Sequence, residues 1–528
     1  MKLLSKIWNT KWGLSLTAGL LLGLSFPPFP FPYLIPFAFI LLFRLSDKTN
    51  SLKELAYYSY VGFVFWNIIV TYWLCMATVA GGIAAILANS VVMTLPMVVI
   101  KYFRDRTKNV YLLSILTASS WVTYEFLHHR WDLAWPWLSL GNAFSSTPWL
   151  IQYISITGPL GITFWILIIA TLLYRLVLKA NRTLSLILAI IILVPAALSI
   201  YQYFTVSITA PKKMQVLVIQ PNYNSYLDLA GYSNAYTPLK KIIAFTDSNR
   251  TDSTDLILWP ENAVQAGITQ HSAFSNLLSR KSQEWHTTLI TGATLFYYYP
   301  PNKHPLVVRK AGPHRYYNVF NAAMGYQPDG SITYYEKAKL VPLIERVPFV
   351  TFLKKVIPFN IDWGQISGYG RGRKVKDFNT GSGRITALVC YDEDFPNWVR
   401  QFVNKGSDVI SVITNDGWWG KSSGYIQHFE YARLRAIENH RYVVRSANNG
   451  ISCVIANNGK VLKQTKYWTR VAFRSEIPEM HYETIYTRYG DWLGYVTMII
   501  TFAGIVFLVI KKLVSKSQPS EMTTISRE

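Results

Sequence analysis

The stretch Arg384-Ile-Thr-Ala-Leu-Val-Cys390-Tyr-Asp-Glu-Asp-Phe-Pro396 decides how the chain is interpreted. Residues 385–389 are apolar and partly β-branched, which predicts a short buried strand. Asp394 or Asn397 can cap a helix that follows. Cys390 therefore lies where a strand gives way to a helix, and a helix start lowers the pKa of a thiol and favours an oxyanion. The position suits a nucleophile, although most free cysteines are small buried apolar residues.

The composition outside this stretch predicts a membrane protein. Of the 528 residues, 51% are hydrophobic and 15% are charged, which is more apolar than soluble domains are. The net charge is +23, but the basic residues lie in short loops between apolar segments, so membrane topology explains them better than nucleic-acid binding. Three cysteines cannot all pair, and neither they nor the histidines show metal-site spacing, so we expect no disulfide framework and no metal.

Eight apolar segments are long enough to cross, or nearly cross, about 30 Å of hydrocarbon. The first, residues 14–26, follows three lysines as a signal peptide would, but no small-residue cleavage site comes after it, so we expect a retained helix. The other seven are residues 33–43, 55–78, 82–100, 110–127, 157–174, 184–204 and 491–510.

The loops between these segments predict an orientation. Four basic residues lie within 101–108, whereas the loops at 27–32 and 79–81 hold none and the loop at 128–156 holds Arg130 alone. By the positive-inside rule, the large polar segment lies outside the cytoplasmic membrane. We expect seven membrane helices in residues 1–204, an extracytoplasmic domain in 205–490, the eighth helix in 491–512 and a cytoplasmic tail in 513–528.

The pattern changes in the large domain to short apolar runs that alternate with longer amphipathic stretches, which predicts an α/β domain with helices covering the sheets. The expected strands are residues 216–219, 256–259, 288–291, 385–389 and 409–413. The expected helices are residues 237–248, 272–284, 397–405 and 426–440.

Reactive groups follow three strand ends, at residues 256–260, 334–336 and 384–389. These groups are Glu261, Lys337 and Cys390, and strand ends are where catalytic groups collect in α/β sheets. A thiol, a carboxylate that takes its proton and an ammonium that stabilises negative charge are sufficient for acyl transfer through a thioester. Each also has an ordinary explanation, because Glu261 can be a helix cap and Lys337 a solvated charge.

Short motifs surround these three residues, and others lie elsewhere in the chain: Trp259-Pro-Glu261, Tyr335-Glu-Lys337, Leu340-Val-Pro342, Cys390-Tyr391, Phe26-Pro-Pro-Phe29, Pro136-Trp-Leu138, Asn415-Asp-x-Trp418 and Asn448-Asn-Gly-Ile451. The Glu, Lys and Cys motifs, in that order, resemble those of the nitrilase superfamily, whose fold is an αββα sandwich. With eight membrane segments and a domain inserted before the last, the chain resembles its membrane-embedded branch, the apolipoprotein N-acyltransferase family of bacterial inner membranes.

The resemblance implies roles for individual residues. Glu261 is expected to be the general base, Lys337 the oxyanion stabiliser and Cys390 the acylated nucleophile. Glu345 matches the second glutamate of the family, and a carboxylate there would keep the lysine charged. Tyr391 would line the acyl-binding site, and its backbone N–H could complete the oxyanion hole.

The sequence also departs from the family pattern. Leu343-Ile344 stands where the family usually has Phe-Gly, and Asp392 stands where it usually has Glu, although the shorter carboxylate could make the same hydrogen bond. The family's lid tryptophan has no secure match. Trp418 and Trp419 could cover a lipid-facing entrance or form an aromatic cluster between the domain and the membrane.

The implied activity is transfer of an acyl chain from a membrane phospholipid, through a thioester on Cys390, to the N-terminal amine of diacylglyceryl-cysteine in apolipoproteins. Phospholipid, apolipoprotein and the bilayer are the expected partners, with no nucleic acid and no cofactor. One alternative is a membrane-tethered amidase with water as acceptor. A transporter or receptor with an inert outer domain is disfavoured, because apart from Glu125 the segments hold almost no ionisable groups at their centres.

Overall fold

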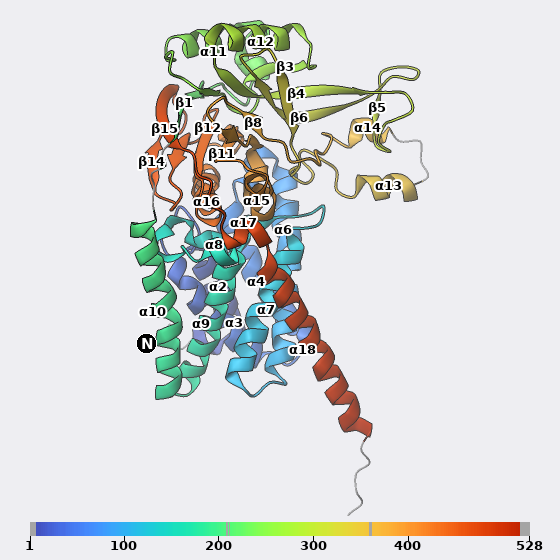
Figure 1. The fold of residues 1–528 in the computed structure, drawn as a ribbon. Coiled ribbons are helices and arrows are strands. Elements are labelled where there is room, and N and C mark those ends of the chain that lie inside the picture. The colour runs from blue at the N-terminus through green and yellow to red at the C-terminus, as the bar shows by residue number, and fades with distance from the viewer. Residues whose placement is uncertain (1–6, 207–209, 211, 358–361, 518–528) are drawn as a thin grey trace, which may run out of the picture.

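A helix bundle and a sheet domain make up the part of the chain that the computed structural model describes, residues 7–206, 210, 212–357 and 362–517. Figure 1 shows the sheet domain standing on one end of the helix bundle. The long helices of the bundle are α2 (Lys11–Gly23), α3 (Ile35–Lys48), α4 (Leu52–Thr71), α6 (Val79–Arg104), α7 (Val110–His128), α9 (Leu160–Leu178), α10 (Arg182–Thr205) and α18 (Trp492–Ser517).

Five of these helices, α6, α7, α9, α10 and α18, are long and apolar enough to cross a membrane within the described residues. Helices α2 and α3 have 13 and 14 residues, fewer than the roughly 20 that a bilayer requires. Helix α4 has 20 residues, but its tyrosines and Asn67 lower its hydropathy. The expected segment 55–78 is divided, because α4 ends at Thr71 and the short α5 (Leu74–Ala77) precedes α6. That α2, α3 and α4 also cross the membrane, which would give eight spans, therefore stays a prediction.

The sheet domain contains two sheets packed face to face. The first has the order β15-β1-β2-β4-β6-β5, with β3 beside β4 and β7 beside β6. The second has the order β14-β13-β12-β11-β9-β8, with β10 beside β11. Strands of the first sheet are β1 (Lys213–Gln220), β2 (Leu256–Leu258), β3 (Val264–Ile268), β4 (Thr288–Tyr299), β5 (Arg309–Lys310), β6 (Tyr316–Tyr326), β7 (Ile332–Glu336) and β15 (Val471–Pro478). Strands of the second sheet are β8 (Phe378–Asn379), β9 (Arg384–Ile385), β10 (Leu388–Val389), β11 (Val409–Thr414), β12 (Tyr442–Ala447), β13 (Cys453–Ile455) and β14 (Val461–Gln464).

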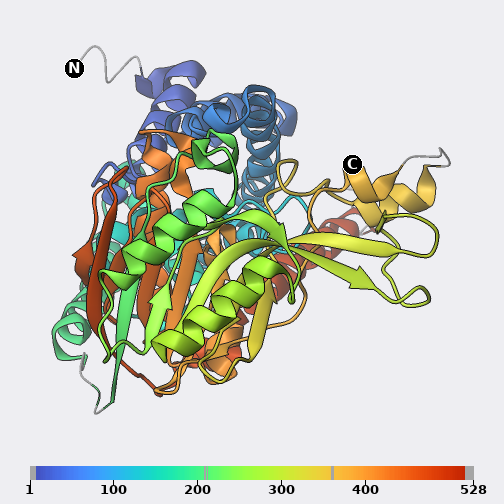
Figure 2. The same cartoon turned by 90° about the horizontal axis from the view of Figure 1, so that it is seen from above.

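Helices cover the outer face of each sheet, which completes an αββα sandwich. In β1, Val216 and Val218 face the core between the sheets, whereas Leu217 and Ile219 pack against α11 (Tyr236–Asp247) and α12 (Ala273–Trp285). Both faces of the strand are buried, since successive side chains point to opposite sides. Figure 2 shows α11 and α12 lying across the first sheet.

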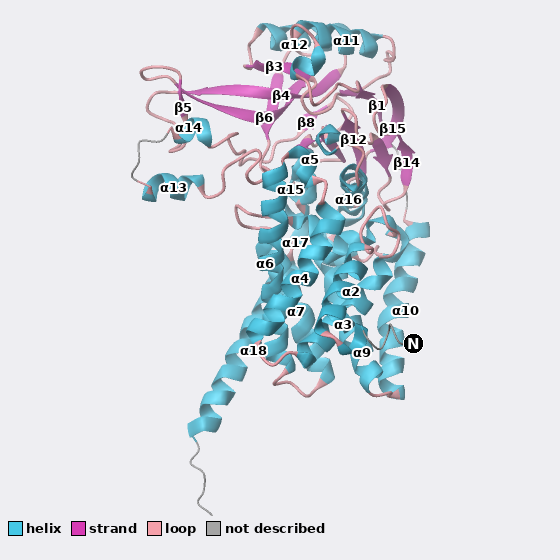
Figure 3. Ribbon diagram, turned by 180° about the vertical axis from the view of Figure 1, so that it is seen from behind, coloured by secondary structure: helices cyan, strands magenta, loops and turns pink. Residues whose placement is uncertain are grey.

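The helices of the second sheet, α15 (Pro396–Asn404) and α16 (Ser423–Asn439), lie between that sheet and the bundle (Figure 3). Gln427 of α16 holds the sheet domain to the bundle, because both the nitrogen and the oxygen of its side-chain amide form hydrogen bonds to bundle residues. Its Nε2 donates to the Pro27 carbonyl at 2.7 Å, and its Oε1 accepts from the Trp73 and Trp137 indoles at 3.1 and 2.7 Å. The position of the sheet domain over the bundle is thus set by buried, paired polar groups.

Candidate active site

The three reactive residues expected from the sequence line one cavity of about 340 Å³. Glu261 follows β2, Lys337 follows β7 and Cys390 follows β10. Strands β2 and β7 belong to the first sheet and β10 to the second, so the cavity lies where the two sheets meet. The three residues are between 1 and 9% exposed, so the reacting groups are held largely away from water.

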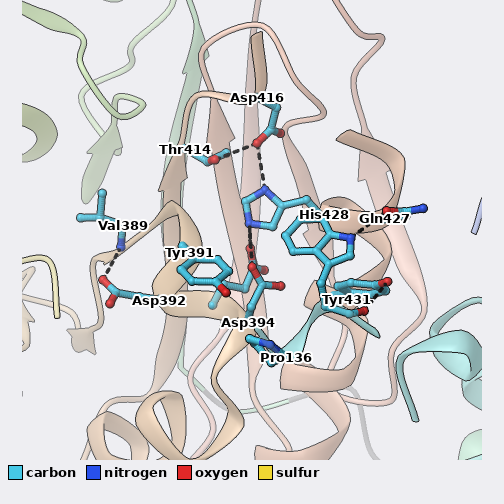
Figure 4. Close-up of polar contacts among 12 residues, drawn as sticks. Pro136, Val389, Tyr391, Asp392, Asp394, Thr414, Asp416, Gln427, His428 and Tyr431 are labelled. Atoms are coloured by element: carbon cyan, nitrogen blue, oxygen red, sulfur yellow. Dashed lines mark hydrogen bonds and ion pairs between the residues drawn. The ribbon is translucent and has the colours of Figure 1, made fainter. Parts of the chain in front are cut away.

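Cys390 begins a short 3-10 turn, η6 (Cys390–Asp394), and its backbone φ is 48°. This left-handed conformation costs about 1–3 kcal/mol for a residue with a side chain and is common at functional sites. Asp392 stabilises the turn by accepting from Val389 N at 3.2 Å, Lys339 N at 2.8 Å and the Tyr335 hydroxyl at 2.9 Å. Figure 4 shows Asp392 directed at Val389. The shorter acid thus ties the cysteine turn to the segment that carries the lysine.

Lys337 lies between two carboxylates. Its Nζ is 2.9 Å from Glu345 Oε1 and 3.6 Å from Glu261 Oε1. Asn321 of β6 donates from its Nδ2 to Glu261 Oε1 at 2.6 Å and to Glu345 Oε1 at 3.2 Å. Glu345 Oε2 also accepts from Val341 N at 2.9 Å. One amide and one ammonium therefore set the spacing of the two acids.

The charges of this cluster shift its proton affinities in a direction that suits proton transfer. Burial raises the pKa of Glu261, with Glu345 adding to the rise and Lys337 opposing it. Burial alone would lower the pKa of Lys337, but Glu345, Cys390 and Glu261 raise it well above its usual range. The lysine is therefore a permanent cation, and Glu261 is a carboxylate with an increased affinity for a proton.

The expectation of a thiol with a lowered pKa is wrong. Burial and the Glu261 charge raise the pKa of Cys390 well above its usual range, although Lys337 opposes them. Helix α15 starts at Pro396, beyond the intervening 3-10 turn, so its N-terminus is too far along the chain to act on the sulfur. Neither Asp394 nor Asn397 caps that helix, because its N-cap is Phe395. The resting cysteine is a neutral thiol that needs a base.

Aromatic rings from both parts of the chain line the cavity. Trp419 of the sheet domain lies 4.7 Å from Trp73 of the bundle, measured between ring centroids. Trp418 stands at the surface, 42% exposed. The Tyr391 hydroxyl donates to the Ala134 carbonyl at 3.0 Å, which fixes its ring in the wall. Trp419 thus belongs to an aromatic cluster between the domain and the bundle, which is one of the two roles considered for the Trp pair.

Family models match both parts of the chain. The model described as apolipoprotein N-acyltransferase N-terminal domain matches residues 18–172, and the model described as carbon-nitrogen hydrolase matches residues 218–479. The chain belongs to the apolipoprotein N-acyltransferase family. The second match gives the sheet domain the nitrilase-like carbon-nitrogen hydrolase fold, in agreement with its αββα layers.

Curated relatives that carry the name apolipoprotein N-acyltransferase match nearly the whole chain. The protein of Chlorobaculum tepidum is 28% identical over 96% of this chain and 97% of its own length. That of Rickettsia typhi is 29% identical over 90% and 93%. Among solved structures, a CN-hydrolase superfamily protein from Xanthomonas campestris covers 50% of this chain and 90% of its own, with 17% identity and a TM-score of 0.36. A nitrilase-superfamily member from Saccharomyces cerevisiae covers 52% and 92%, with 16% identity and a TM-score of 0.38.

A second cavity, of about 250 Å³, adjoins the first on the side of α6. Its wall is mostly apolar and includes Leu343 and Ile344, which stand where the family usually has Phe-Gly and are each more than half exposed. The residues that line both cavities are Leu74, Trp135, Val341 and Ile344.

Sequence reasoning missed three polar residues of the site. Asn321 could have been noticed as an amide within the apolar run of β6. Asp394 was considered only as a helix cap, and His428 was not considered, yet both line the cavity. No spacing rule predicts that α16 brings its histidine against the cysteine turn, because that contact arises from tertiary packing alone.

Proposed function

We propose that this enzyme acylates lipoproteins by moving an acyl chain from a membrane phospholipid to the N-terminal amine of a diacylglyceryl-cysteine. A thioester on Cys390 is the intermediate. Family membership supports the acyltransferase activity. The observation that carries the mechanism is that the buried side chains of Glu261, Lys337 and Cys390 line one cavity, which adjoins an apolar cavity against a membrane helix.

In the first half-reaction, Glu261 takes the thiol proton as Cys390 attacks the ester carbonyl of the phospholipid. Lys337 and the backbone N–H of Tyr391 stabilise the tetrahedral oxyanion. Glu261 then gives its proton to the departing lysophospholipid oxygen. Because burial raises the pKa of the Cys390 thiol, the attack requires a base, and Glu261 supplies it.

In the second half-reaction, Glu261 takes a proton from the amine of the acceptor as that amine attacks the thioester carbonyl. The C–S bond breaks, the proton passes from Glu261 to the sulfur of Cys390, and the products are the amide and the free thiol. Both substrates are confined to the bilayer surface, so a site that adjoins the bundle meets them at a high effective concentration. The aromatic wall limits access of water to the thioester. An amide is more stable than a thioester, so this step requires no nucleotide.

We also propose that the chain crosses a bacterial inner membrane eight times, with the sheet domain on the periplasmic side. The uneven distribution of basic residues between the loops supports this orientation. A single cysteine placed at Asp252 in a chain otherwise free of cysteine should react with a membrane-impermeant thiol reagent in intact spheroplasts. One placed at Lys48 should react only after lysis. The opposite pattern would contradict the orientation.

The nucleophile is tested with acyl-labelled phospholipid. Wild-type protein should acquire a label that hydroxylamine removes, and Cys390→Ala should acquire none and lose turnover. Cys453→Ser is the matched control, because Cys453 is fully buried in β13 and lines neither cavity, so it should label normally. Label on Cys453, or full turnover in Cys390→Ala, would contradict the mechanism. Release of free fatty acid in place of amide would indicate an amidase-like hydrolase.

A further inference from the structure

A groove of about 670 Å³ lies outside the active site, between the hairpin of β4 and β6 and the segments 346–351 and 370–376. Its lining shares no residue with either of the two cavities described above. Glu336 lines the groove, whereas the next residue, Lys337, lines the active-site cavity, so one segment of chain separates the two spaces. A groove of this volume falls within the range of roughly 300–1,000 Å³ at which proteins bind small ligands.

The lining of this basic groove includes five cations, which are Arg346, Arg371, Arg373, Lys374 and Lys376. Glu336 is the one acid in the lining that the structure describes. Arg373, Lys374 and Lys376 are exposed, and among the described residues none of the three forms an ion pair. The groove therefore carries a surplus of positive charge, and the repulsion between these cations falls when an anion enters.

Arg346 is held in a position that suits an anion. Its Nη1 donates to the Tyr369 carbonyl at 2.6 Å, and this is the one side-chain hydrogen bond of Arg346 among the described contacts. Burial lowers the pKa of Arg346 to about 10, and the neighbouring Arg371 and Arg373 contribute to the decrease. The guanidinium is still charged at neutral pH, but cations surround it. A fixed guanidinium with free N–H groups matches a phosphate through two parallel hydrogen bonds.

The loop that follows α7 ties the groove to the helix bundle. Asp132 of that loop accepts from Arg371 Nη1 at 2.9 Å through Oδ1 and from the Phe349 backbone N at 2.8 Å through Oδ2. Phe349 precedes α13 (Val350–Val356), and Thr351 of that helix lines the groove. Figure 1 shows α13 beside the bundle, close to the level of its upper end, and Figure 3 shows the same arrangement from behind. The groove therefore lies near the ends of the membrane helices.

Helix α13 presents apolar side chains outward. Phe352 and Val356 are 62 and 53% exposed, and because they are four residues apart they share one face of the helix. Phe349, at the start of the helix, is 40% exposed. An exposed apolar face beside membrane helices is typical of a helix that lies in the membrane interface. Lipid headgroups are then the anions nearest to the groove.

We propose that the basic groove binds the phosphate of an anionic phospholipid from the surrounding bilayer, a lipid that is held and not consumed. A zwitterionic headgroup would bring its own ammonium among the five cations, so a headgroup whose only charge is its phosphate fits better. Because Arg346 directly follows Glu345, a lipid held there also restrains the segment whose carboxylate pairs with Lys337. The proposal rests on the proposed membrane orientation of the sheet domain, but not on acyl transfer.

The test is photo-crosslinking in full-length protein reconstituted in lipid nanodiscs. The photoreactive residue p-benzoylphenylalanine replaces Tyr297, which lines the groove, and in a second sample it replaces Tyr298. Tyr298 is exposed and lies on the same strand, but it does not line the groove, because successive side chains of a strand point to opposite faces. Capture of labelled phosphatidylglycerol is compared with capture of labelled phosphatidylcholine at the same mole fraction.

Two sets of substitutions are compared in the Tyr297 sample, and thermal unfolding verifies that each protein is folded. The groove variant combines Arg373→Gln, Lys374→Gln and Lys376→Gln. The matched control combines Arg280→Gln, Lys240→Gln and Lys463→Gln, which remove three exposed cations that do not line the groove. Arg373→Gln alone is the milder second variant.

The Tyr297 sample should capture phosphatidylglycerol about fivefold or more over phosphatidylcholine, since each cation near an anionic lipid adds to binding. The groove variant should lower that capture about tenfold or more, Arg373→Gln should lower it by a smaller factor, and the matched control should keep it. Higher salt should reduce capture, because ions screen exposed charges. The Tyr298 sample should show no preference between the two lipids.

Three results would overturn the lipid site: equal capture of the two lipids at Tyr297, wild-type capture in the groove variant, or an equal loss in the matched control. Displacement of the lipid by a soluble acidic peptide would also overturn it and would assign the groove to a polypeptide. Crosslinking requires no turnover, so each of these failures would leave the thioester assay, and with it the proposed function, unaffected.

Discussion

Asn321 offers the sharpest test of the site, because one amide donates to both acids of the cluster. Asn321→Ala removes the 2.6 Å hydrogen bond to Glu261 Oε1 and the 3.2 Å bond to Glu345 Oε1. A hydrogen bond to a buried charge is worth about 1.5–3 kcal/mol. At 1.36 kcal/mol per pH unit, its loss should raise the pKa of Glu261 by about 1–2 beyond the rise that burial already causes.

The sign of the effect on rate follows from the role of Glu261. The general base works as a carboxylate, and a higher pKa leaves less carboxylate at any pH below it. The acidic limb of the pH profile for thioester formation should therefore move to higher pH by about 1–2, and the rate at a fixed pH on that limb should fall about 10- to 100-fold. At pH values above the new pKa, most of the rate should return.

The assay is single-turnover labelling by acyl phospholipid over a pH series, with Asn318→Ala as the matched control. Asn318 lies on the same strand and is also buried, but its Nδ2 donates to the Val307 carbonyl at 3.2 Å and touches neither acid. An unshifted profile in Asn321→Ala would refute the reasoning. So would an equal shift in Asn318→Ala, since the effect would then come from disturbance of β6 in general.

Two further predictions concern stability. Gln427→Ala removes the amide that joins α16 to the bundle and leaves the buried Trp137 indole and Pro27 carbonyl unpaired, so it should lower the unfolding free energy by about 2–4 kcal/mol. Thermal unfolding measures this loss. The control Gln401→Ala loses one local hydrogen bond to the Asn397 carbonyl and should lower the unfolding free energy far less. Asp394 has a folded pKa raised from 3.8 to about 7, so its ionisation destabilises the fold progressively between those values. Asp394→Asn should therefore match wild type near pH 4 and exceed it by at most about 4 kcal/mol at pH 8, and a variant less stable than wild type at both pH values would contradict this sign.

The elements of the sheet domain could be predicted closely where local pattern and packing agree. The expected strand 409–413 is β11 and the expected helix 272–284 is α12, each within one residue at either end. The expected strand 385–389 is instead interrupted, as β9 and β10, because Thr386 exchanges side-chain hydrogen bonds with Ser411 of β11 in place of the regular ladder. Side-chain hydrogen bonds can replace backbone ones here only because of the residue that the neighbouring strand presents. The local sequence does not identify that strand.

The site was predictable only in part for a similar reason. The order of the sequence motifs along the chain identified Glu261, Lys337 and Cys390 as candidate catalytic residues, and the structure brings them to one cavity. The pKa of the Cys390 thiol was predicted to be lowered, but burial and the Glu261 carboxylate raise it. An argument from the adjacent helix start alone does not include either effect, because both arise from residues that are distant in the sequence. Asn321 and His428 were missed for that reason too.

The sequence by itself determined where the apolar helices α6, α7, α9, α10 and α18 lie and where several of the buried strands lie, because hydrophobicity and side-chain period are local properties. It also determined the kinds of reactive group at the strand ends. Only the tertiary structure decided how those groups affect one another. Charge interactions depend on separation and burial, and residues as far apart along the chain as Glu261, Cys390 and His428 acquire both only when the two sheets close over the helix bundle.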